Sequence, residues 1–139
     1  MIKIKTNSVT ETENEGKKLA AKLAPGSVVA LSGEMGVGKT AFVRGLAEGL
    51  GVKSIVSSPT YAIVHEYEGD VKLYHFDMFR LESENELFDI GWDEYANSGG
   101  ICAVEWSENI SSALPPKYID VKITTIGTNS RQIEITTAT

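Results

Sequence analysis

Residues 33–40 read Gly-Glu-Met-Gly-Val-Gly-Lys-Thr and fit the pattern G-x-x-x-x-G-K-[ST]. This pattern is typical of a P-loop, which wraps its backbone around the phosphates of a nucleoside triphosphate. Its glycines leave room for backbone N–H groups to approach the polyanion closely. Lys39 can reach the β- and γ-phosphates, and the Thr40 hydroxyl can ligate Mg²⁺. A chain with this loop must place a strand before it and a helix after it.

The segments on both sides of the loop fit that requirement. Residues 27–32 are a short apolar run that predicts a buried strand, and residues 40–47 open a predicted helix. The phosphates would lie at the helix N-terminus, where unpaired N–H groups and the helix dipole favour anions. A purely structural glycine turn is the alternative, and both flanks argue against it. We therefore expect a nucleotide to be bound by Gly33, Glu34, Met35, Gly36, Val37, Gly38, Lys39, Thr40 and Ala41.

Length and composition set the outer limits. We expect one domain over residues 1–139, large enough for a core without metal or disulfide support. The formal net charge of −6 and the absence of a Lys/Arg-rich run disfavour direct binding of RNA or DNA. The single cysteine, Cys102, lies in an apolar run, which predicts a buried thiol in a reducing compartment. No apolar stretch is long enough for a membrane span and no signal-peptide layout is present, so we expect a cytoplasmic protein.

The rest of the chain predicts a compact α/β fold, with three layers and a mixed central sheet, of the P-loop nucleotide hydrolase type. Thr10 followed by Glu13 resembles a capping box that would begin the first helix. A turn at residues 68–70 and one at residues 127–129 predict two antiparallel hairpins. The predicted strands are residues 1–5, 27–32, 61–67, 71–77, 101–104, 118–126 and 131–137, and the predicted helices run to about Ala24, from 40 to about 49, and over about 84–96 with a break at Gly91.

Two carboxylates follow predicted strands, where α/β folds place their sites. Glu105 ends the most apolar strand, the position of the metal-organising acid in P-loop enzymes, where it can hold Mg²⁺ directly or through water. Asp77 ends the returning hairpin strand and can orient water, act as a base or support the metal shell. A solvated acid at a strand end is the alternative for each.

Several other residues have a plain structural interpretation. Ser58, Pro59 and Thr60 favour a simple turn from the residues alone, although Thr60 is also typical of a switch threonine that senses the γ-phosphate. His65 and His75 fall within predicted strands at spacings unlike a metal pair, so we interpret them as core or surface imidazoles.

Missing motifs narrow the function classes. The chain has no Asn-Lys-x-Asp segment, the usual guanine reader, so ATP is favoured over GTP. A small-molecule kinase usually clamps its second substrate with several arginines, and this chain has only Arg44, Arg80 and Arg131. The hypotheses left open are an ATPase that is slow without a partner, a small-molecule kinase, and a nucleotide sensor that does not hydrolyse ATP.

The motifs, in this order, resemble the bacterial TsaE (YjeE) family, the small P-loop ATPase of tRNA threonylcarbamoyladenosine biosynthesis. The resemblance covers nearly the whole chain, and His-Phe-Asp-x-x-Arg-Leu followed by Glu-Trp is its most specific part. Phe79 stands where the family commonly has tyrosine. The matching segments are residues 33–40 running into Arg44-Gly45, Ser58-Pro59-Thr60-Tyr61, residues 74–81, the acidic stretch to Gly91, and residues 104–108.

The resemblance implies a role for each motif. It implies that the P-loop binds ATP through residues that include Lys39, and that Thr40 and Glu105 organise Mg²⁺. It further implies that Asp77 is the catalytic or water-orienting carboxylate and that residues 58–60 form a switch-like loop. The implied partners are TsaD and TsaB, which transfer threonylcarbamoyl to an adenosine beside the tRNA anticodon. The ATP cycle of this chain would then reset that complex, and tRNA would be met only indirectly.

Overall fold

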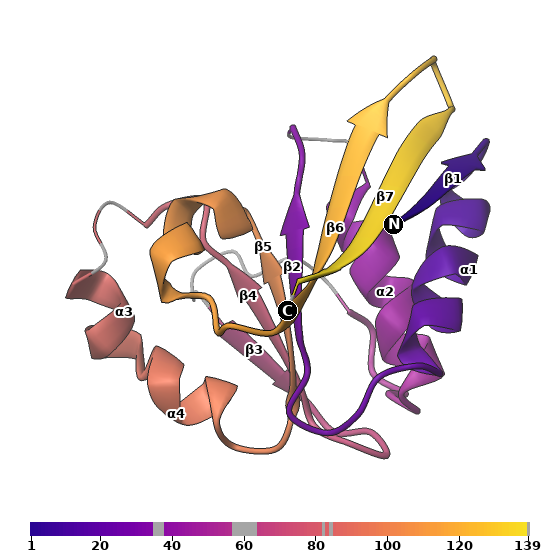
Figure 1. Ribbon diagram of the computed structural model, residues 1–139. Coiled ribbons are helices and arrows are strands. Elements are labelled where there is room, and N and C mark those ends of the chain that lie inside the picture. Colours follow the sequence, from indigo (N-terminus) through magenta and orange to yellow (C-terminus); the bar gives the residue numbers. More distant parts are fainter. Residues whose placement is uncertain (35–37, 57–63, 82, 84, 139) are drawn as a thin grey trace.

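The computed structural model describes residues 1–34, 38–56, 64–81, 83 and 85–138. Within these residues, the centre of the fold is a seven-stranded sheet with the order β1-β7-β6-β2-β5-β4-β3 (Figure 1). The strands are β1 (Ile2–Thr6), β2 (Val28–Ser32), β3 (Val64–Tyr67), β4 (Leu73–Asp77), β5 (Ile101–Glu105), β6 (Tyr118–Thr125) and β7 (Arg131–Ala138).

The sheet is mixed, as the sequence predicts. Its central strands run parallel, with β2 between β5 and β6 and with β4 beside β5. The edges are antiparallel, because β3–β4 and β6–β7 form the two predicted hairpins and β1 pairs with β7. The carboxyl ends of β2, β4 and β5 therefore meet at one edge of the sheet, which is where parallel sheets place their sites. Residues 61–63, predicted as the start of β3, lie outside the described residues.

Helices cover both faces of the sheet, which confirms the three layers (Figure 1). On one face lie α1 (Val9–Ala20) and α2 (Lys39–Gly49), and on the other lie α3 (Asn85–Ile90), α4 (Trp92–Ala96) and the 3₁₀ helix η1 (Ser107–Ala113). Alternate residues of the strands feed the two resulting cores. In β5, for example, Ala103 packs with the α1–α2 core, whereas Cys102 and Val104 pack with the aromatic core under α4. The predicted break at Gly91 separates α3 from α4, and its φ of 76° favours glycine.

The start and end of α1 differ from the prediction. The N-cap is Ser8, whose hydroxyl accepts the Glu11 N–H, while the Glu11 carboxylate accepts the Asn7 N–H. The capping box thus begins two residues before Thr10, and Glu13 is left to form a 3.1 Å ion pair with Arg44 of α2. The helix ends at Ala20 rather than near Ala24.

Glycines let α1 and α2 approach until their backbones touch. A methyl carbon built on Gly16 would lie 2.2 Å from the Phe42 carbonyl oxygen, and one built on Gly45 would lie 1.7 Å from the Glu13 carbonyl oxygen. Both distances are far inside van der Waals contact, so these positions accept no side chain without a shift of a helix. Because α2 follows the P-loop directly, this contact also fixes where the P-loop helix begins.

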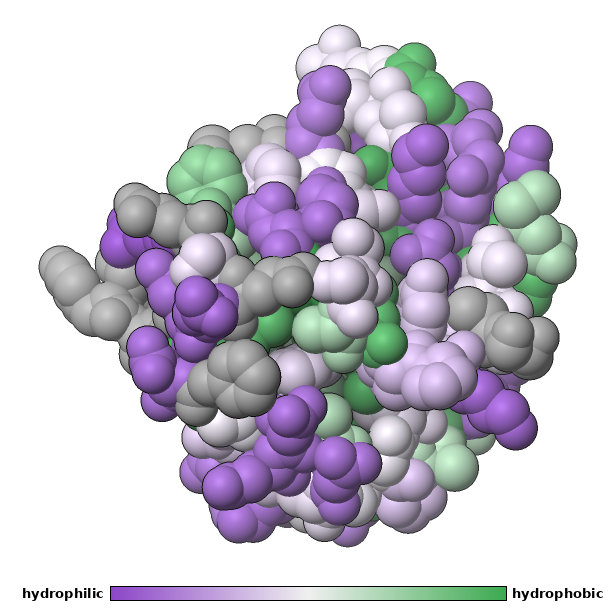
Figure 2. Space-filling model, turned by 60° about the vertical axis from the view of Figure 1, so that its left-hand side comes forward, coloured by the Kyte–Doolittle hydropathy of each residue, from purple (hydrophilic) through white to green (hydrophobic). Residues whose placement is uncertain are grey.

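The surface is mostly polar on the side that Figure 2 shows. The hydrophobic areas on that face are small and separate. Among the described residues, no helix has the length and apolar character needed to cross a membrane.

Candidate functional site

The predicted strand–loop–helix unit is present, and glycine geometry marks both ends of its loop. β2 ends at Ser32, and Gly33 follows with a φ of 141°. Gly38 is the N-cap of α2 with a φ of 104°, and no side chain of a described residue caps the helix. The first N–H groups of α2 are therefore open to an external anion. Met35, Gly36 and Val37, also predicted to bind the nucleotide, lie outside the described residues.

Lys39 is buried at the start of α2 and already has partners. Its ammonium donates a 2.6 Å hydrogen bond to the Gly33 carbonyl oxygen and lies 3.5 Å from the centroid of the Trp106 ring. Burial lowers the pKa of Lys39, while the charges of Glu108, Glu105 and Asp77 act to raise it. The Lys39 ammonium is thus held by the Gly33 carbonyl and the Trp106 ring, and it can move from this position towards a bound phosphate.

Thr40 and Glu105, predicted together as the metal pair, are in contact. The Thr40 hydroxyl oxygen lies 3.1 Å from each carboxylate oxygen of Glu105. Thr40 belongs to the first turn of α2 and Glu105 is the last residue of β5, so the contact joins the P-loop helix to the sheet. Glu105 is 3% exposed, which excludes the solvated strand-end interpretation.

Asp77 lies beside Glu105, since the two are paired in register at the ends of the parallel strands β4 and β5. One oxygen of Asp77 accepts the Phe79 N–H at 2.9 Å, which holds the carboxylate at the turn after β4. Both carboxylates line the same hollow as Lys39 and Thr40. The structure therefore brings together the four predicted side chains that it describes in this region.

His75 is a residue whose contact the sequence analysis missed. Its ring is fully buried, as a core imidazole should be, but its Nε2 lies 2.5 Å from Glu105 Oε2. The signal was available in the spacing, because His75 and Asp77 are two residues apart in one strand and must share a face of the sheet. The sequence does not show that β4 lies next to β5. Because the two strands are neighbours, the face of β4 that carries His75 lies beside Glu105.

Trp106 is the second missed residue. It follows β5 with φ 58° and ψ 42°, the left-handed region that a bulky residue enters at a cost of about 1–3 kcal/mol. This backbone places the indole under the Lys39 ammonium, with the Phe79 ring tilted against it at a centroid distance of 4.9 Å. Backbone strain held at a site beside a charged group is typical of functional positions.

These residues surround two hollows that adjoin each other. We call the first, of about 360 Å³, the central hollow; it is lined by Val9, Gly38, Lys39, Thr40, Ala41, Arg44, Asp77, Phe79, Glu105 and Trp106. The second, the adjoining hollow of about 320 Å³, is lined by Asn7, Ser8, Val9, Thr12, Gly38, Ala41, Asn129 and Arg131. They share Val9, Gly38 and Ala41, so together they run past the N-terminus of α2. The predicted switch residues Ser58, Pro59 and Thr60 lie outside the described residues.

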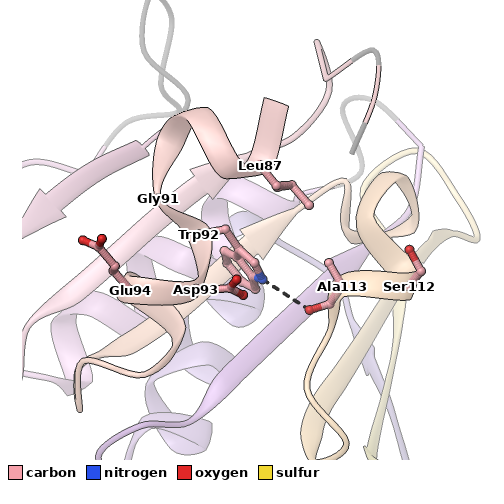
Figure 3. Close-up of a pocket in the computed structure, with 7 residues that line it drawn as sticks. All are labelled: Leu87, Gly91, Trp92, Asp93, Glu94, Ser112 and Ala113. Atoms are coloured by element: carbon pink, nitrogen blue, oxygen red, sulfur yellow. Dashed lines mark hydrogen bonds between the residues drawn. The ribbon is translucent and has the colours of Figure 1, made fainter. Parts of the chain in front are cut away.

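A separate hollow of about 280 Å³ opens on the opposite face of the sheet, between α3–α4 and η1 (Figure 3). The side chains of Leu87 and Trp92 lie on its inner side, and Trp92 Nε1 donates a 3.2 Å hydrogen bond to the Ala113 carbonyl that ties α4 to η1. Asp93 and Glu94 bring negative charge to the same wall. None of the described P-loop residues lines it, so we assign the predicted nucleotide chemistry to the central hollow.

Comparison with known proteins agrees with this geometry. The family model described as "Threonylcarbamoyl adenosine biosynthesis protein TsaE" matches residues 6–133. A tRNA threonylcarbamoyladenosine biosynthesis protein TsaE from Bacillus subtilis is 43% identical over 97% of this chain and 85% of its own length, and one from a Nostoc species is 41% identical over 98% and 86%. A crystal structure of YdiB from Bacillus subtilis superposes with a TM-score of 0.84 at 38% identity, over 99% of this chain and 84% of that one. On the family match and these identities, this chain belongs to the TsaE family.

Proposed function

We propose that this protein is a Mg²⁺-dependent ATPase that acts as an accessory subunit in the synthesis of threonylcarbamoyladenosine in tRNA. The observation that carries the proposal is the contact of Thr40 with Glu105 at the open N-terminus of α2, beside Lys39. The process is the one named in its relatives, which match nearly the whole chain.

The two hollows together suit an elongated nucleotide. The phosphates would lie at Gly38 and Lys39, where α2 presents its open N–H groups and the ammonium. The nucleoside would then extend past Ala41 into the adjoining hollow, towards Asn129 and Arg131. That hollow offers an amide and two hydroxyl groups around the start of α1 and the amide of Asn129 in the β6–β7 turn, which suits a sugar and a base.

The Thr40–Glu105 pair fits Mg²⁺ in chemistry and spacing. Mg²⁺ prefers oxygen ligands at about 2.0–2.1 Å in octahedral geometry, so two neighbouring ligands lie about 2.9 Å apart. The Thr40 hydroxyl and the Glu105 carboxylate oxygens are 3.1 Å apart. No group of three or more His, Cys, Asp or Glu side chains among the described residues could form a metal cage. Binding through one or two protein oxygens, with phosphates and water completing the shell, is the usual arrangement for Mg²⁺ in nucleotide sites.

Hydrolysis would use the same side chains in distinct roles. Lys39 and the N–H groups of the P-loop stabilise negative charge on the transferring phosphoryl group, and bound Mg²⁺ neutralises further charge on the phosphates. Asp77 faces the hollow beside Glu105 and is placed to orient the attacking water or accept its proton. Glu105 and Thr40, which are in contact, would hold the metal ion.

The proposed partners come from the family resemblance, and the proposed location comes from the sequence. By the resemblance, the complex of TsaD and TsaB transfers threonylcarbamoyl, and the ATP cycle of this chain would reset it. The sequence predicts that this happens in the cytoplasm. The acidic charge of −6 supports indirect contact with tRNA, because a surface of this charge repels the phosphate backbone unless a partner holds it. ATP and Mg²⁺ are the cofactors of this scheme.

The test is release of inorganic phosphate from Mg²⁺·ATP, with and without TsaD and TsaB. We expect slow release alone and faster release with the pair. Lys39→Ala or Thr40→Ala should abolish productive binding, whereas Asp77→Ala or Glu105→Ala should lower turnover more than binding. Glu66→Ala is the control, since Glu66 is an exposed carboxylate on β3.

Three results would contradict the proposal. Wild-type turnover in Asp77→Ala or Glu105→Ala would remove that residue from the mechanism. Transfer of the phosphate to a small acceptor, without release, would indicate a kinase. Tight nucleotide binding with no phosphate release in either condition would indicate a sensor that does not hydrolyse ATP.

A further inference from the structure

We propose that His75 is a positioning residue: it holds the Glu105 carboxylate in the orientation that binds Mg²⁺ with the nucleotide. This inference rests on the proposed function, because it assigns His75 a part in building that metal site. It concerns a residue that touches Glu105 but does not line the central hollow.

The register of the sheet places His75 behind Glu105. In the parallel pair β4–β5, His75 lies opposite Ala103, and Asp77 lies opposite Glu105. His75 is therefore on the same face of the sheet as Glu105, two residues before the strand ends. The small side chain of Ala103 leaves room for the imidazole to reach forward. Its Nε2 lies 2.5 Å from Glu105 Oε2.

The Glu105 carboxylate therefore has hydrogen-bond partners on two different elements. His75 donates to one carboxylate oxygen from β4, and the Thr40 hydroxyl lies 3.1 Å from both oxygens at the start of α2. A glutamate has three side-chain torsions to lose when it becomes a metal ligand, and a fixed partner removes that freedom in advance. The bond from His75 thus prepares the carboxylate for the metal before the nucleotide arrives.

A simple packing role does not account for the imidazole. The cluster on this face consists of aliphatic and aromatic side chains such as Leu73, Phe42 and Ile101. The ring is 0% exposed, and its Nδ1 has no hydrogen-bond partner among the described residues. A phenyl ring would fill a similar volume without burying an unpaired polar atom. The contact with Glu105 is what a phenyl ring would lack.

The chain offers a matched control. His65 is the register partner of His75 on the other side, in β3. It is only partly buried, and its Nδ1 lies 3.2 Å from the Tyr67 hydroxyl. His65→Phe and His75→Phe therefore make the same chemical change in neighbouring strands, but only the second removes a partner of Glu105.

The experiment measures how much Mg²⁺ strengthens binding of a non-hydrolysable ATP analogue, by calorimetry with the metal present and with it chelated. We expect His75→Phe to reduce the Mg²⁺-dependent gain in affinity by about tenfold or more, the usual effect of losing a partner of a metal ligand. Binding without Mg²⁺ should stay at the wild-type level. His75→Gln, whose amide can still donate to Glu105, should recover part of the gain, and His65→Phe should leave it unchanged.

A double-mutant cycle separates positioning from folding. In a Glu105→Gln background, His75→Phe should cause no further loss of Mg²⁺-dependent affinity, because its action runs through the carboxylate. If His75→Phe does not fold, His75→Leu, which also lacks a donor to Glu105, replaces it in the cycle.

The inference is overturned if His75→Phe keeps the full Mg²⁺-dependent gain, or if it loses affinity equally with and without the metal. It is also overturned if the losses from His75 and Glu105 simply add. A wild-type protein whose nucleotide binding ignores Mg²⁺ would instead refute the proposed function itself.

Discussion

Replacing Gly45 with alanine tests the backbone contact that fixes the start of the P-loop helix. A methyl carbon on Gly45 would lie 1.7 Å from the Glu13 carbonyl oxygen and 2.5 Å from its carbonyl carbon. Carbon and oxygen atoms in close contact are about 3.3 Å apart, so α1 and α2 would have to separate by roughly 1.6 Å at this point. Neither clashing atom is the end of a flexible side chain, so the backbone itself must move.

Two effects of opposite sign determine how much Gly45→Ala changes the free energy of unfolding. Alanine is more favourable than glycine inside a helix by about 1 kcal/mol. Overpacking a close contact typically costs about 1–3 kcal/mol, and separating the helices also loosens the side chains between them, such as Leu19 and Leu46. Because the clash is with backbone, we take the upper end of that range and expect a net loss of about 2 kcal/mol. In a chain of this length this corresponds to a fall of roughly 8 °C in Tm.

Urea unfolding followed by circular dichroism measures this loss directly. Gly127→Ala is the matched control, because a methyl carbon there would come no closer than 3.5 Å to any neighbour, and we expect a change within about 0.5 kcal/mol. Nucleotide affinity should fall in Gly45→Ala as well, since Lys39 and Thr40 move with α2. Equal unfolding midpoints for the two variants would show that α1 and α2 are not in backbone contact and would refute the reasoning.

Three further predictions use single residues. Burial raises the pKa of the Cys102 thiol to about 12. A thiol reagent at mildly alkaline pH should therefore modify the unfolded chain and spare the folded one. Rapid modification of the folded protein would contradict this. Burial also raises the pKa of Asp120, so the unfolded chain releases the carboxyl proton at a lower pH than the folded protein does. The free energy of unfolding therefore falls as pH rises from the ordinary carboxyl pKa through the raised one. Asp120→Asn should raise Tm at neutral pH and give no gain below the ordinary carboxyl pKa. In Trp92→Phe, Trp106 is the remaining tryptophan, and its emission should change when Mg²⁺·ATP draws Lys39 from the indole; unchanged emission at saturation would contradict that movement.

The sequence predicts those parts of the fold that depend on residues close together in the chain. The apolar run before the P-loop can only be a buried strand, and β2 is buried at four of its five residues. Strand alternation and turn residues likewise predict both hairpins. Glu105 was predicted to end the most apolar strand, and it is the last residue of β5, buried against Thr40; its role as a metal ligand stays a prediction.

The remaining features depend on tertiary neighbours that spacing does not reveal. Thr10 and Ser8 offer overlapping capping boxes, and Ser8 is used while Glu13 pairs with Arg44 on a helix formed later in the chain. The contact of His75 with Glu105 requires β4 to lie beside β5, although the two strands are separated by α3 and α4. The position of Trp106 against Lys39 depends on a left-handed backbone conformation that has no signature in the sequence.

The charges of the central hollow explain why Mg²⁺ should matter for binding as well as for hydrolysis. Three carboxylates, those of Glu108, Glu105 and Asp77, act on the ammonium of Lys39. A second cation that lines the hollow, Arg44, already forms an ion pair with Glu13, so among the described residues little unpaired positive charge is left in the hollow. ATP would add about four negative charges to it, and charges at close range repel strongly where burial limits screening. Lys39 must also leave the Gly33 carbonyl and the indole before it can reach a phosphate, which lowers its net contribution. On the proposed function, Lys39 would offset only part of this repulsion, so we expect nucleotide binding as well as hydrolysis to depend on a divalent cation.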